Sequence, residues 1–245
     1  MSALTGTATL VRAMLRRDRV VLPLCVLVAV GFVILTASSF QDLYPTAADR
    51  ADFAATIRSN STFTALYGPP RGPDSIGGLT AWRIGSTLAT VVALMSLLLV
   101  GRHTRGDEER GRTELLCAGA VGRHAPIAAA LALVAATDTT IAALVALGLI
   151  ALGLPAAGSV ALGASLGATG LVFAGVGAVA AQLTDGARAA NGIAGAALGA
   201  AYLLRAAGDS GDGTLSWLSP IGWGRRRARS PTSGGGRCCS ASPPP

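Results

Sequence analysis

Lysine is absent from the 245-residue sequence, so all 20 basic residues are arginines. A phosphate-binding loop of the Walker A type needs a lysine to contact the β- and γ-phosphates of its nucleotide. Enzymes that form a Schiff base with their substrate need a lysine nucleophile. The sequence therefore excludes both chemistries from these 245 residues.

Charged and aromatic residues are also scarce. They make up 13% and 4% of the chain, whereas 51% of the residues are hydrophobic and the mean hydropathy is +0.54. A soluble domain carries about 25% charged residues, so the composition indicates a protein of the lipid bilayer. The net charge of +7 does not predict a nucleic-acid partner, because much of it comes from residues 224–245, which contain no acid. The arginines of that segment are Arg225, Arg226, Arg227, Arg229 and Arg237.

The four cysteines, Cys25, Cys117, Cys238 and Cys239, have no spacing that suits a metal site or a disulfide framework. The two histidines, His103 and His124, lack a partner at helical spacing, and we expect them to meet lipid headgroups. We therefore predict no metal, no cofactor, no catalytic residue and no enzymatic activity.

Five apolar stretches approach the roughly 20 residues that a membrane-crossing helix needs. They are residues 20–37, 81–101, 126–153, 158–181 and 190–207, the last of them weakened by its Gly and Ala content. Arginines gather before the first stretch and between the second and third, and Arg188 follows the fourth. The positive-inside rule then places the N-terminus in the cytoplasm. The sequence predicts an all-α polytopic membrane protein with about five transmembrane helices.

The predicted layout follows from this alternation. It comprises a cytoplasmic N-terminal segment (1–19), a transmembrane domain (20–207) with an extracellular loop (38–80) and a cytoplasmic loop (102–125), an interfacial segment (208–223) and a tail (224–245). The stretch ADRADFAATI in the extracellular loop predicts a short helix. The tail joins an arginine cluster to Ser, Gly and Pro, a composition that cannot pack. We expect it to be disordered and non-native, as a stretch read out of frame, and the alternative is a disordered basic tail.

The predicted loop at 102–125 contains many charged residues and lies between two of the apolar stretches. Residues 95–123, MSLLLVGRHTRGDEERGRTELLCAGAVGR, contain an acidic pair, a glycine and then Glu-Leu-Leu before a small-residue turn. This pattern resembles the first cytoplasmic loop of type-2 ATP-binding-cassette exporter permeases. The stretches YPTAADRADFAATI, ALYGPP, GLTAWRIG, AQLTDGARAANG, LLRAAGD and LSWLSPIGW are similar to actinobacterial exporters of polyketide antibiotics, of the tetronasin type. The resemblance covers about residues 8–223.

The resemblance implies a six-span half-permease that lacks its last span, and a loop that couples it to a cassette ATPase. The implied coupling residues are Asp107, Glu108, Glu109, Gly111, Arg112, Glu114, Leu115 and Leu116. A short amphipathic helix at the membrane surface would let Leu115 and Leu116 face the bilayer or the bundle, and the charged residues, Asp107 among them, face the cytoplasm. The alternative is a solvated loop without a partner.

A carboxylate lies near the middle of the third apolar stretch, at Asp138. A charge there costs about 2.5–3.5 kcal/mol on insertion scales, so such a residue suggests a function by default. Asp138 is a candidate for the substrate path, where it could attract a cationic drug or carry a proton. The alternative is a protonated or hydrogen-bonded aspartate beside Thr137, Thr139 and Thr140.

Small residues recur at a spacing that lets transmembrane helices approach closely. The two pairs are Gly163 with Gly167 and Gly195 with Gly199, and a chance origin in so Gly-rich a chain is the alternative.

These features together predict a permease fragment of an exporter in the bacterial plasma membrane. Its expected partners are a cassette ATPase, a second permease half, the lipid bilayer and an amphipathic drug such as a polyketide antibiotic. A non-transporting membrane scaffold or immunity protein, and a non-functional truncated fragment, are the alternatives.

Overall fold

The computed structural model describes residues 4–59, 72, 75–111, 122 and 124–210. Every regular element in this part of the chain is an α-helix, which confirms the predicted all-α class. The helices are α1 (Thr7–Arg17), α2 (Val21–Leu43), α3 (Ala47–Ser59), α5 (Ile76–His103), α6 (Arg105–Glu108), α8 (Ala125–Ala151), α9 (Ala156–Leu183) and α10 (Ala187–Ser210).

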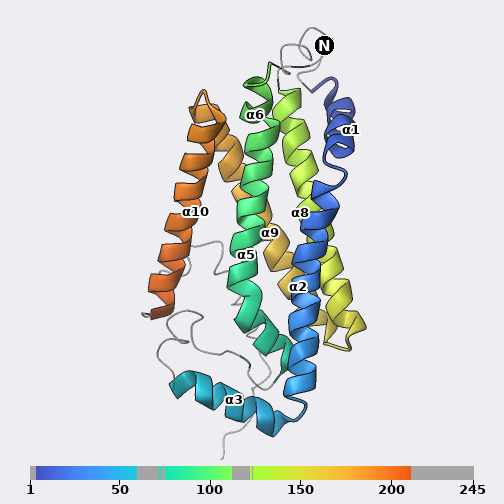
Figure 1. Ribbon diagram of the computed structural model, residues 1–245, viewed down its shortest axis with the longest axis vertical. Coiled ribbons are helices and arrows are strands. Elements are labelled where there is room, and N and C mark those ends of the chain that lie inside the picture. The colour runs from blue at the N-terminus through green and yellow to red at the C-terminus, as the bar shows by residue number, and fades with distance from the viewer. Residues whose placement is uncertain (1–3, 60–71, 73–74, 112–121, 123, 211–245) are drawn as a thin grey trace, which may run out of the picture.

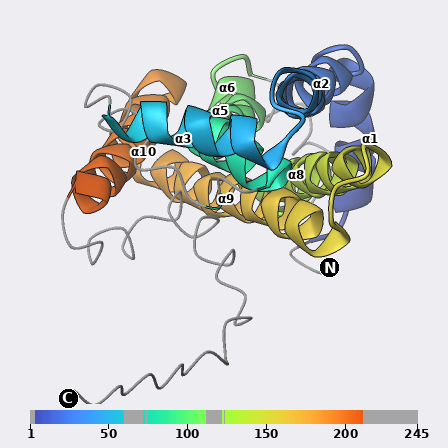
Figure 2. The ribbon, with the colours of Figure 1, turned by 90° about the horizontal axis from the view of Figure 1, so that it is seen from below.

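Five long helices run side by side along the long axis of the molecule, and shorter helices close its two ends (Figure 1). Seen along that axis, α8, α9 and α10 form one row, and α2 and α5 lie on one side of it (Figure 2). Helix α9 packs most extensively against α8 and α5, so these three form the centre of the bundle. Helices α1 and α6 lie at one end, the α6 end, and α3 lies across the other, the α3 end.

Four of the helical stretches are long and apolar enough to cross a membrane: Val21–Leu43, Ile76–Glu108, Ala125–Ala151 and Ala156–Leu183. They correspond to the first four predicted spans. The fifth predicted stretch does form a helix, α10, which packs on α9 and α5. It is not among the helices that meet this measure of length and hydropathy, so a fifth crossing stays a prediction.

The distribution of apolar and polar side chains is typical of a protein surrounded by lipid. Large apolar side chains face outward, and α2 shows this most clearly: 22% of its span is buried, against 61% for Ile76–Glu108. Leu27 and Leu35 of α2 are 69% and 68% exposed. Polar side chains such as Ser96 and Thr169 are instead buried between helices. Apolar groups outside and satisfied polar groups inside are what the bilayer interior demands.

Glycines bring α8 and α9 into close contact. A Cβ atom at Gly163 would lie 2.3 Å from the backbone oxygen of Ala142, and one at Gly167 would lie 3.0 Å from the Cβ of Ala142. The first predicted small-residue pair is therefore a real helix contact. A Cβ at Gly195 or Gly199 would meet no described atom within 4 Å, so that pair serves no such contact here.

Helix α3 confirms the helix predicted within residues 38–80, and its start is capped reciprocally. The backbone N–H and the hydroxyl of Thr46 donate to Oδ2 of Asp49 at 3.1 and 2.7 Å, and the N–H of Asp49 donates to the hydroxyl of Thr46 at 3.1 Å. Such a cap satisfies N–H groups that lack a partner within the helix.

Other predicted segments lie partly or wholly outside the described residues. This holds for most of residues 60–74, for 112–121, and for both the interfacial segment and the tail from 211 onward. Helix α1, in the N-terminal segment, was not predicted. Its Leu10 and Met14 are buried, and α1 packs against α8.

Candidate functional site: a charged junction at the α6 end

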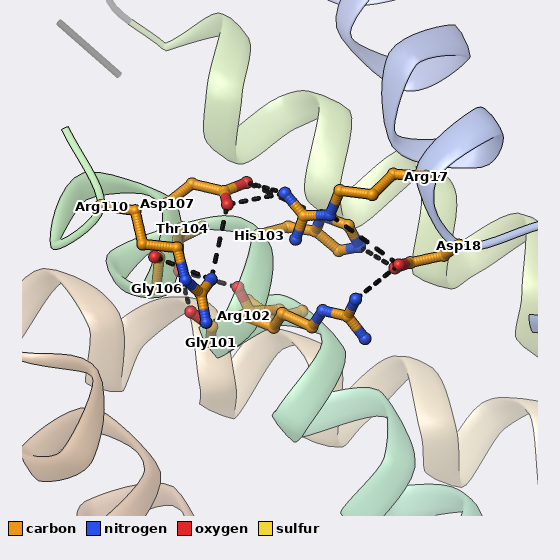
Figure 3. A network of polar contacts seen from close by, with 10 residues as sticks. Arg17, Asp18, Gly101, Arg102, His103, Thr104, Gly106, Asp107 and Arg110 are labelled. Atoms are coloured by element: carbon orange, nitrogen blue, oxygen red, sulfur yellow. Dashed lines mark hydrogen bonds and ion pairs between the residues drawn. The ribbon is translucent and has the colours of Figure 1, made fainter. Parts of the chain in front are cut away.

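Charged side chains at the α6 end join parts of the chain that are distant in sequence (Figure 3). We call the group formed by Arg17, Asp18, Arg102, His103 and Asp107 the charged junction. The first two residues lie where α1 passes into α2, and the others lie at the end of α5 and in α6. The junction therefore ties the N-terminal helix to the start of the loop that was predicted to be cytoplasmic.

Asp18 is the most deeply buried member of the junction, with 0% of its surface exposed. Its Oδ1 accepts a hydrogen bond from Arg102 at 2.7 Å, and its Oδ2 lies 2.8 Å from Nε2 of His103. A buried carboxylate is stable only when it is paired in this way. His103 is itself 1% exposed, so the expectation that it meets lipid headgroups is wrong.

Asp107 forms the second half of the junction. Both of its carboxylate oxygens accept from the same nitrogen of Arg17, at 2.7 and 2.9 Å. The guanidinium of Arg110 lies 3.8 Å away on the other side. We expected the side chain of Asp107 to face the cytoplasm, and this was wrong, because it is buried and turned toward α1.

Two further residues of this region contact the turn between α9 and α10. The Nε of Arg105 donates to the carbonyl of Ala181 at 2.5 Å, near the end of α9. The N–H of Ala187, the first residue of α10, donates to Oε1 of Glu109 at 2.7 Å. A cation at a helix C-terminus and a carboxylate at a helix N-terminus both complement the helix dipole. The charges after α5 therefore hold both ends of this turn as well as α1.

The predicted coupling residues divide into two groups. Glu108 and Glu109 are exposed and could be reached by a partner, whereas Asp107 is buried. Gly111 has a φ of +67°, a left-handed conformation that favours glycine. Arg112, Glu114, Leu115 and Leu116 lie outside the described residues. Within the described residues, no three His, Cys, Asp or Glu side chains are grouped to hold a metal ion.

Asp138 lies at the contact of α5, α8 and α9 and is 0% exposed. The hydroxyl of Ser96 lies 2.9 and 3.1 Å from its two oxygens. A Cβ at Gly170 would lie 2.5 Å from its carboxyl carbon. The neighbouring threonines instead donate to backbone carbonyls of their own helix, so the partner of Asp138 comes from another helix.

Three open grooves border α2, with volumes of about 630, 470 and 430 Å³. The largest lies between α2, α3 and α5 at the α3 end, and the 470 Å³ groove is an apolar one between α2 and α5. The third lies between α1, α2 and α8, and Asp18 and Arg19 line it. Asp138 lines none of the three.

One feature of the sequence points to the junction. Asp18 is the single acid among the arginines of residues 1–19. An isolated carboxylate next to an apolar span predicts a pair with a basic residue, although it does not say with which one.

The chain is similar to the multidrug efflux system permease protein Rv1217c of Mycobacterium tuberculosis, with 47% identity over 223 residues. The match covers 91% of this chain and 40% of that relative, so the chain spans well under half the length of the protein it resembles. No family profile matches the chain.

Proposed function

We propose that this chain is the permease portion of an ATP-binding-cassette exporter that moves amphipathic drugs out of a bacterial cell across its plasma membrane. The observation that carries the proposal is the 47% identity, over 91% of the chain, to a multidrug efflux permease. Four helices of membrane-spanning length support it, as does the charged junction at the α6 end. Polyketide antibiotics are the proposed substrates.

The proposed energy source is a separate cassette ATPase, because this chain has no lysine for a phosphate-binding loop. The protein itself then performs mechanical coupling and no covalent chemistry. The exposed Glu108 and Glu109 offer a polar contact surface for the ATPase. A second permease half is a further proposed partner, since the similar permease is more than twice as long as the matched region.

Within this mechanism the charged junction would carry movement from the ATPase into the bundle. A push on α6 acts on α1 through the pair of Asp107 with Arg17, and on the turn between α9 and α10 through Arg105 and Glu109. Charge-assisted hydrogen bonds of this length are directional and among the stronger polar contacts. A role of Asp138 in the substrate path stays a prediction.

Co-purification tests the proposal. The tagged chain is purified from its source cells, and the cassette ATPase recovered with it is identified by mass spectrometry and measured. We expect recovery with the unmodified chain and a loss of about tenfold or more with Glu108→Arg, because a reversed charge opposes a complementary surface.

Asp52→Arg is the matched control, since it reverses an exposed carboxylate on α3, at the other end of the bundle. It should leave the recovery of the ATPase unchanged. Absence of the ATPase from the unmodified preparation, or an equal loss in both variants, would refute the coupling.

A further inference from the structure

The 430 Å³ groove between α1, α2 and α8, which we call the α1 groove, has a charged part and an apolar part. Asp18 and Arg19 line it where α1 passes into α2, next to the charged junction. Apolar side chains such as Leu22, Val26 and Leu133 line the rest. A phospholipid shows the same division, since a charged headgroup is joined to hydrocarbon chains.

The α1 groove lies at the edge of the apolar spans. Arg19 directly precedes the apolar stretch 20–37, and a long basic side chain in that position extends toward the lipid headgroups. The α2 side chains that line the groove, from Leu22 to Leu27, belong to that stretch. Leu27 is 69% exposed on the outside of the bundle. The groove is therefore open to the lipid, with Arg19 at headgroup depth and its apolar walls at the depth of the acyl chains.

The other polar residues that line the groove are already engaged. The carboxylate of Asp18 accepts from Arg102 in the charged junction. The hydroxyls of Thr137 and Thr140 donate to backbone carbonyls of their own helix at 2.9 and 2.8 Å. Arg19 is exposed and makes no hydrogen bond or ion pair with another residue that the structure describes. Polar recognition in the groove therefore falls to its guanidinium.

Two further arginines lie on the exposed side of α1. Arg12 and Arg16 precede Arg19 by seven and three residues, spacings that return to the same side of a helix. Both are exposed, and within the described part of the chain neither has an ion pair or a hydrogen bond from its side chain. The opposite side of α1, with Leu10 and Met14, is buried, and α1 packs against α8. The surface beside the groove is therefore positively charged.

We propose that the α1 groove binds an anionic phospholipid of the leaflet at the α6 end, with its phosphate on Arg19 and an acyl chain along Leu22 and Leu27. A guanidinium forms two parallel hydrogen bonds with a phosphate, and basic pockets between transmembrane helices are known to bind anionic headgroups. Arg12 and Arg16 favour a lipid with a net negative charge over a zwitterionic one. The proposal does not rest on the proposed function, because it needs neither transport nor an ATPase.

Quenching of tryptophan fluorescence by lipids with brominated acyl chains measures the binding, because bromine quenches a tryptophan on contact. Leu27→Trp places a reporter in the groove. Val179→Trp, at a residue of α9 that is 58% exposed, places a control reporter near the α6 end. In both, Phe replaces the native Trp82, Trp217 and Trp223. The purified chain is placed in phosphatidylcholine bilayers, to which brominated phosphatidylglycerol or brominated phosphatidylcholine is added.

The reporter in the groove should distinguish the two lipids. At Leu27→Trp, we expect phosphatidylglycerol to bind about fivefold more tightly than phosphatidylcholine, roughly the contribution of one arginine near an anionic surface. At Val179→Trp, we expect the two lipids to differ less than twofold, because that reporter meets lipid outside the groove.

Four variants assign this preference to residues. Arg19→Gln should reduce it to less than twofold, and Arg19→Lys should keep part of it. Arg12→Gln removes an exposed arginine of α1 that does not line the groove, so it should have a smaller effect than Arg19→Gln. Arg188→Gln removes an exposed arginine at the start of α10, near the α6 end, and should have no effect.

Three results would overturn the proposal. The first is equal binding of the two lipids at Leu27→Trp, and the second is an equal effect of Arg19→Gln and Arg12→Gln, which would indicate a diffuse attraction without a site. The third is quenching by neither lipid at Leu27→Trp when Val179→Trp is quenched, since the groove would then be covered by protein.

A free anion is distinguished from a lipid by adding sodium phosphate, or sodium chloride at the same ionic strength. We expect both salts to weaken the preference for phosphatidylglycerol equally, by screening. If phosphate removes the preference and chloride does not, Arg19 binds a soluble phosphate and the proposal is wrong.

Discussion

The two ends of the helix bundle are held together by different chemistry. At the α6 end, hydrogen bonds of 2.7–2.9 Å join carboxylates to arginines that are 84 and 90 residues away in the sequence. At the α3 end, the contacts between α2, α3 and α5 include aromatic rings 4.6–6.5 Å apart beside an open groove. Charge-assisted hydrogen bonds are directional, and aromatic rings likewise prefer offset or edge-to-face geometries. The first end is therefore joined by charged and polar pairs, and the second by apolar ring contacts.

Helix α5 connects these two ends. Its Arg83 and Ile84 line the groove between α2, α3 and α5, and its Arg102 and His103 belong to the charged junction. Its 28 residues correspond to a rod of about 42 Å at 1.5 Å per residue. In the proposed exporter, a displacement imposed at one end of this rod reaches the other directly.

The largest expected effect comes from breaking the junction. Asp18→Ala leaves Arg102 and His103 without their buried carboxylate, and hydrogen bonds to charged groups contribute about 1.5–3 kcal/mol each. We expect a large drop in the unfolding midpoint of the purified protein, followed by intrinsic fluorescence during heating. Asp42→Ala, which removes an exposed carboxylate near the α3 end, should leave the midpoint nearly unchanged. Similar midpoints for the two variants would mean that the ends do not differ in this way.

The helices could be predicted from sequence because they depend on local properties. Length and hydropathy placed the spans near α2, α5, α8 and α9. The stretch ADRADFAATI, which follows Tyr44-Pro45, predicted α3. The boundaries were less accurate: α2 continues to Leu43, six residues beyond its predicted end. The reason is that SSFQDL is polar enough to end an apolar stretch but still compatible with a helix.

The pairings at the charged junction could not be predicted, because they depend on which helices are neighbours. The pattern GDEERG implies an amphipathic segment, but it does not show that Arg17 would approach from a distant part of the chain and turn Asp107 inward. Asp138 illustrates the same limit. The alternative interpretation placed its carboxyl beside the threonines next to it in sequence, whereas the observed partner is Ser96 of α5.

The next largest expected effect comes from a substitution in the middle of the bundle, between its two ends. Gly170→Ala places a Cβ 2.5 Å from the carboxyl carbon of Asp138, so the side chain or the helix has to move. Overpacking of this kind costs about 1–3 kcal/mol. Gly175→Ala, on the same helix, meets no described atom within 4 Å and is the matched control.

We expect Gly170→Ala to lower the unfolding midpoint and to weaken ATPase recovery, while Gly175→Ala changes neither. If Gly170→Ala lowered the midpoint but left ATPase recovery unchanged, the packing in the middle of the bundle would not matter for coupling.

The smallest expected effect concerns the cap of α3. Hydrogen bonds from Thr46, chiefly that of its hydroxyl, hold the pKa of Asp49 below its ordinary value. A carboxyl whose pKa is lowered in the folded state contributes stability above the ordinary pKa and loses it as the pH falls through the lowered value. The first turn of α3 should therefore be intact at neutral pH and loosen below about pH 4. The side chain introduced by Asp49→Asn does not titrate. At neutral pH this variant should exchange the amide hydrogens of residues 47–59 faster than the unmodified chain does. The ratio of the two rates should fall toward one as the pH is lowered. A ratio that stays constant across this range would show that the charge of Asp49 does not hold the helix in place.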